Sequence, residues 1–169
     1  EPAPRNTAPA VLAAALMQAQ TDPEALMLIA PSDHAIPDTA AFHAAIQTAV
    51  ADAREGRIVA FGIRPTHAAL GYGYIECGQV TASGTHELLS FVEKPDADLA
   101  ARMVQDDAYL WNAGIILASA KTLLAAFDAH APQLVPPVAG AVAGAVRDLG
   151  AVRLDPAEWK KAENISLDY

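Results

Sequence analysis

Leu26-Met-Leu-Ile-Ala-Pro-Ser-Asp-His34 is the stretch around which the predicted fold is organised. A continuous apolar run that ends at a proline is typical of a strand buried on both faces of a parallel sheet. Such a strand delivers the residues that follow it to the carboxyl edge of the sheet, where open α/β proteins bind ligands. A carboxylate at this edge can hold a divalent cation against substrate phosphates, so Asp33 is the first candidate for chemistry. The alternative is that Pro-Ser-Asp-His forms only a capped turn.

A helix and a second strand follow in short succession. The helix is expected over residues 40–54, with Phe42, Ile46 and Val50 at helical spacing, and the strand over residues 57–64. A strand, a helix and a strand in this order indicate a parallel crossover unit. The predicted fold class is therefore α/β, with a Rossmann-like core, a mostly parallel sheet and helices on both faces.

Further elements follow from periodicity and from capping residues, with Thr7, Asp38, Asp96 and Ser119 as the expected helix caps. We expect helices at 8–20, 97–105 and 120–130, strands at 74–82, 86–93 and 109–118, and a short strand at 165–169 that carries Asp168.

Composition limits the class of protein and its partners. The chain has 169 residues, of which 53% are hydrophobic and 18% charged, and its formal net charge is −9. These values predict a single folded domain. Because no basic run is longer than Lys160-Lys161, neither nucleic acid nor an anionic membrane is expected as a partner. The single Cys77, with no visible signal peptide and no apolar run long enough to span a bilayer, predicts a cytoplasmic location.

Three loop or strand-end segments carry further candidates for ligand binding. The two glycines of Gly71-Tyr-Gly-Tyr-Ile75 permit a close approach of the backbone to a ligand, although a plain turn explains them as well. Lys94 can offset charge on a phosphoryl group while Glu93 accepts hydrogen bonds from sugar hydroxyls; the alternative is a surface ion pair. The amide of Asn112 both donates and accepts, as a hydroxyl-rich ligand requires, or it belongs to a turn beside a core tryptophan.

Taken in order, these segments resemble the bacterial mannose-1-phosphate guanylyltransferases, or GDP-mannose pyrophosphorylases, including the type fused to a mannose-6-phosphate isomerase domain. The resemblance extends from the first residue to the last. The matching segments are Glu1-Pro2, Arg5-Asn-Thr-Ala-Pro-Ala10, Pro31-Ser-Asp-His34, Phe61-Gly-Ile63, Pro65-Thr66, Gly71-Tyr-Gly-Tyr-Ile75, Phe91-Val-Glu-Lys-Pro95, Trp111-Asn-Ala-Gly114 and Ile165-Ser-Leu-Asp-Tyr169.

The resemblance implies a reaction in which GTP and mannose 1-phosphate give GDP-mannose and pyrophosphate, with Mg²⁺ as cofactor. In this reaction the sugar phosphate attacks the α-phosphorus of GTP in line, and catalysis depends on positioning and electrostatics. The product serves polysaccharide biosynthesis. By the same resemblance, Asp33 and Asp168 are the Mg²⁺ ligands, and Lys94 completes the catalytic set at the sugar phosphate.

Substrate-binding positions are implied in the same way. Glu93 and Asn112 match groups that contact the mannose hydroxyls, and Gly114 follows in the same motif. The remaining positions are Gly71, Tyr72 and Gly73, which match the segment that lines the sugar pocket, and Arg5, Asn6 and Thr7, which lie where the family approaches the nucleotide.

Departures from the family pattern set further expectations. The Gly-rich triphosphate loop of the family does not precede Glu1, and Ala113 stands where the family usually has Ser. We therefore expect a partial nucleotidyltransferase domain over residues 1–169, truncated at both ends and inactive as a fragment. Missing strands would expose sheet edges, which makes a homo-oligomer possible. The alternatives are a non-catalytic module that binds a nucleotide sugar and a pyrophosphorylase for another hexose 1-phosphate.

Overall fold

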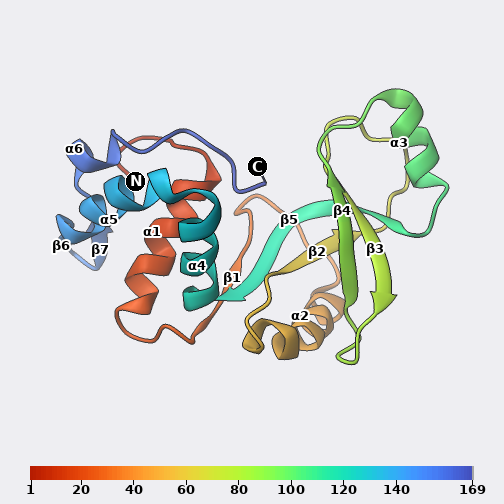
Figure 1. Ribbon diagram of the computed structural model, residues 1–169, viewed down its shortest axis with the longest axis horizontal. Helices are drawn as coiled ribbons and strands as arrows, with labels where there is room; N and C mark the ends of the chain where they lie inside the picture. The colour runs from red at the N-terminus through yellow and green to blue at the C-terminus, as the bar shows by residue number, and fades with distance from the viewer. Residues whose placement is uncertain (169) are drawn as a thin grey trace. The chain divides into compact units, whose positions relative to one another are not determined.

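The computed structural model describes residues 1–168, which form two compact units (Figure 1). One unit comprises residues 1–27 and the segment from Ala118 onwards, and the other comprises residues 28–117. The elements in chain order are α1 (Thr7–Ala19), β1 (Leu26–Ile29), α2 (Thr39–Arg54), β2 (Val59–Ile63), β3 (Tyr74–Val80), β4 (His86–Val92), α3 (Ala97–Val104), β5 (Tyr109–Ser119), α4 (Ala120–His130), η1 (Pro132–Leu134), α5 (Val135–Ala143), β6 (Val146–Asp148), β7 (Ala151–Arg153) and α6 (Pro156–Trp159).

The main sheet is antiparallel, so the prediction of a mostly parallel, Rossmann-like sheet is wrong. Its strand order is β1-β5-β3-β4, with β2 pairing with β5. β5 runs antiparallel to both β2 and β3, and β3 runs antiparallel to β4. The segments of β1 and β2 were predicted to form a parallel crossover unit, but each strand is hydrogen-bonded to β5. An apolar run predicts a strand, whereas the direction of its neighbour depends on distant segments.

Burial of β1 also differs from the expectation. Leu28 is 41% exposed, and the other residues of Leu26–Ile29 are only partly buried. β1 is therefore not a strand covered on both faces. Its apolar run reflects partial burial together with strand propensity, which the sequence pattern cannot separate from complete burial.

Capping residues explain where the helices of the 28–117 unit begin. The side chains of Asp38 and Asp96 accept hydrogen bonds from the third residues of α2 and α3, Ala41 and Leu99, both at N-cap positions. Gly56 follows α2 with a φ of +86°, the left-handed conformation that commonly ends a helix. These features confirm the predicted starts of both helices.

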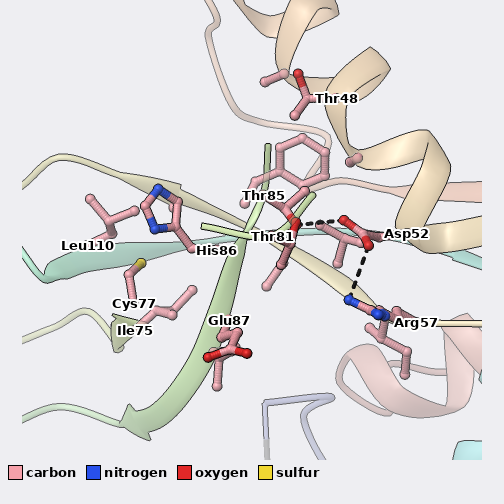
Figure 2. Close-up of a pocket in the computed structure, with 18 residues that line it drawn as sticks. Thr48, Asp52, Arg57, Ile75, Cys77, Thr81, Thr85, His86, Glu87 and Leu110 are labelled. Carbon is pink, nitrogen blue, oxygen red and sulfur yellow. Dashed lines mark hydrogen bonds and ion pairs between the residues drawn. The ribbon is translucent and has the colours of Figure 1, made fainter. Parts of the chain in front are cut away.

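A buried carboxylate ties the β3–β4 hairpin to α2. Asp52, which is only 4% exposed, accepts hydrogen bonds from Ser83 and from Thr85, the latter at 2.6 Å. Arg57 Nη1 lies 3.2 Å from Asp52 Oδ1 (Figure 2). Because a buried charge is stable only when it is paired and hydrogen-bonded, this arrangement fixes the tip of the hairpin against the helix.

The other unit is mainly helical. α1 packs against α4 and α5, and α5 packs against α6. Trp159 is fully buried and its indole N–H donates a hydrogen bond to the carbonyl oxygen of Ala3 at 2.7 Å. Ser119 caps α4 as predicted, since its Oγ accepts from the backbone N–H of Thr122 at 3.1 Å.

The predicted strand at 165–169 is wrong for the residues that the structure describes. Residues 165 and 166 have no regular structure, residues 167 and 168 form a turn, and Tyr169 lies outside the described residues. A short polar segment gains a strand only by pairing, and its local sequence cannot supply a partner. In the described part of the chain, every helix is too short or too polar to cross a membrane. A single truncated domain stays a prediction.

Candidate functional site

Asn112 contacts the glycine turn, which is the segment Gly71-Tyr-Gly73, within the 28–117 unit. The backbone N–H of Asn112 donates to the carbonyl oxygen of Gly73 at 2.8 Å. The side-chain Oδ1 of Asn112 accepts from the N–H of Gly114 at 3.1 Å, and Gly114 has a φ of +65°. A residue with a side chain would be strained at Gly114, so the local sequence Asn-Ala-Gly permits the irregularity of β5 where its register with β2 shifts.

Glu93 lies directly beside the same turn. The antiparallel register pairs Tyr74 with Val92, which brings the residue before Tyr74 next to the residue after Val92. A Cβ atom at Gly73 would lie 2.8 Å from Glu93 Oε2 and 2.7 Å from Phe91 Cζ. The structure therefore brings together four of the predicted sugar-binding residues, which lie on three different segments: Gly73, Glu93, Asn112 and Gly114.

Lys94 has an unusual backbone conformation. Its φ is +47°, which is rare for a residue that carries a Cβ atom. Its Nζ lies 3.2 Å from Glu93 Oε1, and its side chain is 58% exposed. Residues held in such sparsely populated conformations cluster at functional sites, where the surrounding structure fixes them. The strand end thus presents a cation and a carboxylate as an ion pair, which is the alternative that the sequence left open, and the binding role of the two residues stays a prediction.

Gly71 and Tyr72 lie on the exposed side of the turn. A Cβ atom at Gly71 would meet no atom within 4 Å, so the space above this residue is open. The ring of Tyr72 packs edge to face against Trp111, with 5.2 Å between centroids, and His67 contacts the same indole at 4.9 Å. Sequence reasoning assigned no role to His67 or to the Trp111 ring, because packing between distant aromatic rings leaves no local signal.

Asp33 lies in the exposed turn that directly follows β1, as predicted. The preceding Pro31 approaches β5, since a Cβ atom at Gly114 would lie 3.6 Å from its Cγ. This contact places the Pro-Ser-Asp-His segment beside Gly114 and so next to the predicted sugar-binding residues.

The predicted nucleotide-approach residues belong to the other unit and are gathered with Asp168. Thr7 Oγ1 accepts from the backbone N–H of Leu167 at 2.8 Å and lies 3.2 Å from Ser166 Oγ. Ser166 Oγ in turn donates to Asp168 Oδ2 at 3.0 Å. Hydroxyl groups thus connect the start of α1 to the carboxylate of Asp168.

Arg5 and Asn6 serve local structure in this unit. Arg5 Nη2 donates to the carbonyl oxygen of Lys160 at 2.7 Å. Asn6, with a φ of +62°, caps α1 by accepting from the N–H of Thr7 at 3.1 Å. The sequence suggested Thr7 as the cap, and the structure shows that Asn6 has this position.

The carboxylates suit Mg²⁺ only in combination with a substrate. Across residues 1–168 the structure shows no group of three or more His, Cys, Asp or Glu side chains that could hold a metal ion. Mg²⁺ is usually bound by one or two carboxylates together with waters and substrate phosphates. An exposed carboxylate such as Asp33 fits this pattern, because it offers hard oxygen ligands and leaves room for a phosphate.

A pocket of about 510 Å³ lies in the same unit but is separate from the predicted residues. Figure 2 shows its lining, in which Asp52 and Thr85 lie at one end and Cys77, His86 and Leu110 at the other. Burial raises the pKa of the Cys77 thiol, which disfavours the reactive thiolate. None of the predicted site residues is among the described residues that line this pocket.

Residues 1–143 match the Nucleotidyl transferase family, and the chain belongs to that family. It is 42% identical over its whole length to a mannose-1-phosphate guanylyltransferase of Sinorhizobium fredii, of which it covers 33%. It is 40% identical to the xanthan biosynthesis protein XanB of Xanthomonas campestris, again over the whole chain and over 36% of that protein. The chain thus spans about a third of the length of these relatives.

Solved structures show the same similarity. The fold matches a mannose-6-phosphate isomerase from Helicobacter pylori with a TM-score of 0.85 and 28% identity, over 98% of this chain and 63% of that one. It matches a mannose-1-phosphate geranyltransferase from Thermus thermophilus with a TM-score of 0.82 and 30% identity, over 100% of this chain and 47% of that one. The chain is therefore a nucleotidyltransferase-family segment related to mannose-1-phosphate guanylyltransferases.

Proposed function

We propose that the chain supplies the sugar-phosphate site of an enzyme that makes GDP-mannose and pyrophosphate from GTP and mannose 1-phosphate. The observation that carries this proposal is the convergence of Gly73, Glu93 and Asn112 at one point of the 28–117 unit. These residues come from a loop, a strand end and the middle of β5, so their proximity is a product of the fold. The relatives named above supply the reaction.

Glu93, Asn112 and Lys94 have the chemistry that a hexose phosphate requires. Glu93 accepts hydrogen bonds from hydroxyl groups, and it is the better buried member of its ion pair, with a side chain 26% exposed. The Asn112 side chain contributes an amide that donates while its oxygen accepts from Gly114. Lys94 places a positive charge at the end of the same strand, where a phosphate would be stabilised.

Mg²⁺ would neutralise charge on the phosphates when it is bound. Asp33 would hold it in the 28–117 unit, because this carboxylate is exposed at the end of β1 and lies in the segment that approaches Gly114. Asp168 is the second predicted ligand. It belongs to the other unit, where it lies among the hydroxyl groups of Thr7 and Ser166.

Calorimetric titration of the 169-residue chain with GDP-mannose tests the proposal. We expect binding that is stronger with Mg²⁺ than without it, and stronger for GDP-mannose than for GDP-glucose. Equal affinity for both sugars would favour another hexose 1-phosphate as substrate. Absence of binding to GDP-mannose, with and without Mg²⁺, would contradict the proposed function.

A pyrophosphate-release assay with GTP and mannose 1-phosphate separates the enzyme from a binding module. We expect the 169-residue chain to bind without turnover. The same assay on a longer chain that includes the upstream triphosphate loop is expected to show release. Binding by both chains with release by neither would favour a non-catalytic module that holds a nucleotide sugar.

A further inference from the structure

Three aromatic rings pack together beside Gly73. One belongs to Trp111 of β5, and the other two belong to His67 and Tyr72 in the loop before β3. The indole of Trp111 contacts the His67 ring at a centroid distance of 4.9 Å and an angle of 70°, and the Tyr72 ring at 5.2 Å and 73°. Both contacts have the edge-to-face geometry that aromatic rings prefer. Since His67 and Tyr72 are exposed while Trp111 is only 9% exposed, the indole forms the buried base of this three-ring cluster.

Trp111 occupies a rigid position in the sheet. It pairs with Ile63 of β2 on one side and with Tyr74 of β3 on the other. Because successive side chains of a strand point to opposite faces, Trp111 lies on the face opposite to Asn112. The indole therefore supports the glycine turn from behind and does not occupy the face on which Asn112 lies.

The loop that carries the turn has two hydrogen-bonded attachments. The Tyr74 hydroxyl accepts from the N–H of Ala69 at 3.0 Å and donates to its carbonyl oxygen at 3.1 Å. The second attachment is the bond from Asn112 N–H to the Gly73 carbonyl. Tyr72 lies in the chain between Ala69 and Gly73, the two residues that these hydrogen bonds hold. Its packing on Trp111 therefore fixes the part of the loop that the hydrogen bonds do not reach.

We propose that Trp111 and His67 are positioning residues for binding of a hexose phosphate, acting through the ring of Tyr72. This inference rests on the proposed function. The three-ring cluster holds the turn, so that the open space at Gly71 and the carboxylate of Glu93 keep their positions relative to Asn112.

Variants of His67 test whether ring packing positions the turn. We expect His67→Phe to bind GDP-mannose within about twofold of the unchanged chain, and His67→Ala to bind about three- to tenfold more weakly, which is what the loss of one edge-to-face contact amounts to. His67 is exposed, so neither variant should unfold the chain, which thermal denaturation would verify. Tyr72→Leu should weaken binding as well, because it removes the ring that joins the turn to Trp111.

The indole resonances give a readout that a change in stability alone would not produce. The indole N–H of Trp111 has no acceptor among the described residues, whereas that of Trp159 donates to Ala3. The two signals should therefore be distinct in a ¹H–¹⁵N spectrum and can be assigned with Trp111→Phe. On titration with GDP-mannose we expect the Trp111 signal to move, because a ligand bound at the turn changes the surroundings of the Tyr72 ring that packs on the indole.

The outcomes distinguish the inference from the function on which it rests. Equal binding by His67→Phe and His67→Ala, or a Trp111 signal that stays fixed while calorimetry shows binding, would overturn the inference and leave the proposed function standing. Weak binding by both His67 variants would show that ring packing does not account for the effect and would also overturn the inference. Failure of the unchanged chain to bind GDP-mannose overturns both.

Discussion

The backbone N–H of Asn112 donates to the carbonyl oxygen of Gly73 at 2.8 Å, which joins the middle of β5 to the glycine turn. The two residues are far apart in sequence, and neither carries a signal that predicts the other. The bond uses only backbone atoms of the two residues.

Lys94→Gly should separate stability from binding. Glycine adopts the observed φ of +47° without steric cost, so we expect the free energy of unfolding to stay the same or to rise by up to about 1 kcal/mol. Loss of the ion pair with Glu93 costs little because the Lys94 side chain is largely exposed. Affinity for GDP-mannose should fall at least about tenfold, as expected for a lost charge-assisted contact. Urea denaturation and calorimetry measure the two quantities.

Leu149→Gly is the matched control for this experiment. Leu149 has a φ of +48° and a fully exposed side chain at the β6–β7 turn. The same change in stability is expected there, with no loss of affinity. A loss of affinity in Leu149→Gly equal to that in Lys94→Gly would contradict a specific role of the Lys94 side chain.

Gly73→Ala should weaken binding more than it affects stability. The new methyl group would meet Phe91 Cζ at 2.7 Å and Glu93 Oε2 at 2.8 Å, both of which are the ends of side chains that can rotate away. We expect a loss of stability below about 1 kcal/mol, because few atoms have to move. Displacement of the Glu93 carboxylate should lower the affinity for GDP-mannose about tenfold, equivalent to about 1.4 kcal/mol.

Gly71→Ala tests whether the effect is local to Glu93. Its methyl group would meet no atom within 4 Å, so the free energy of unfolding should change by less than about 0.5 kcal/mol. Unchanged affinity in Gly73→Ala, measured beside this control, would show that the position of Glu93 does not matter for binding.

Asp33→Asn should abolish the enhancement of GDP-mannose binding by Mg²⁺. The amide keeps the shape of the side chain but loses the negative charge that a divalent cation requires. Because Asp33 is exposed in a turn, the free energy of unfolding should change by less than about 0.5 kcal/mol. Asp128→Asn, at an exposed position of α4, is the control for loss of one charge. A full Mg²⁺ effect in Asp33→Asn would exclude this residue as the metal ligand.

Asp52→Asn should change the pH dependence of stability. Hydrogen bonds from Ser83 and Thr85 hold the pKa of the Asp52 carboxyl below its ordinary value of 3.8. A lowered folded-state pKa stabilises the fold at pH values above 3.8, and this contribution disappears as the pH falls through the folded-state pKa. We therefore expect the variant to melt at a lower temperature at pH 7, with the difference narrowing below pH 3.8.

Thermal denaturation between pH 7 and pH 3 measures this effect. Asp128→Asn is again a suitable control, because its exposed carboxyl should leave the melting temperature nearly unchanged over the whole range. A constant difference between the unchanged chain and Asp52→Asn at every pH would show that the lost contact is steric and that titration of Asp52 has no part in it.

Local elements of the fold were readable from the sequence. Asp38, Asp96 and Ser119 cap helices where the pattern of capping residues predicted them, because a cap depends on residues within one turn of the chain. The β3–β4 hairpin and the turn that carries Asp33 followed from local signals as well. The segments that bear Glu93, Lys94 and Asn112 were singled out for the same reason, since residue type and spacing indicate the chemistry.

Only the tertiary structure decided how these segments meet. The antiparallel pairing of β5 with β2 and β3 overturned the predicted parallel sheet, because strand direction depends on partners that are remote in sequence. Pairing of β3 with β5 placed Gly73 against Asn112 and the Trp111 ring behind Tyr72, and pairing of β3 with β4 placed Gly73 against Glu93. The sequence determined which groups the protein offers to a ligand. Long-range strand pairing and ring packing determined that they stand together, since such contacts depend on the whole chain and leave no trace in any single segment.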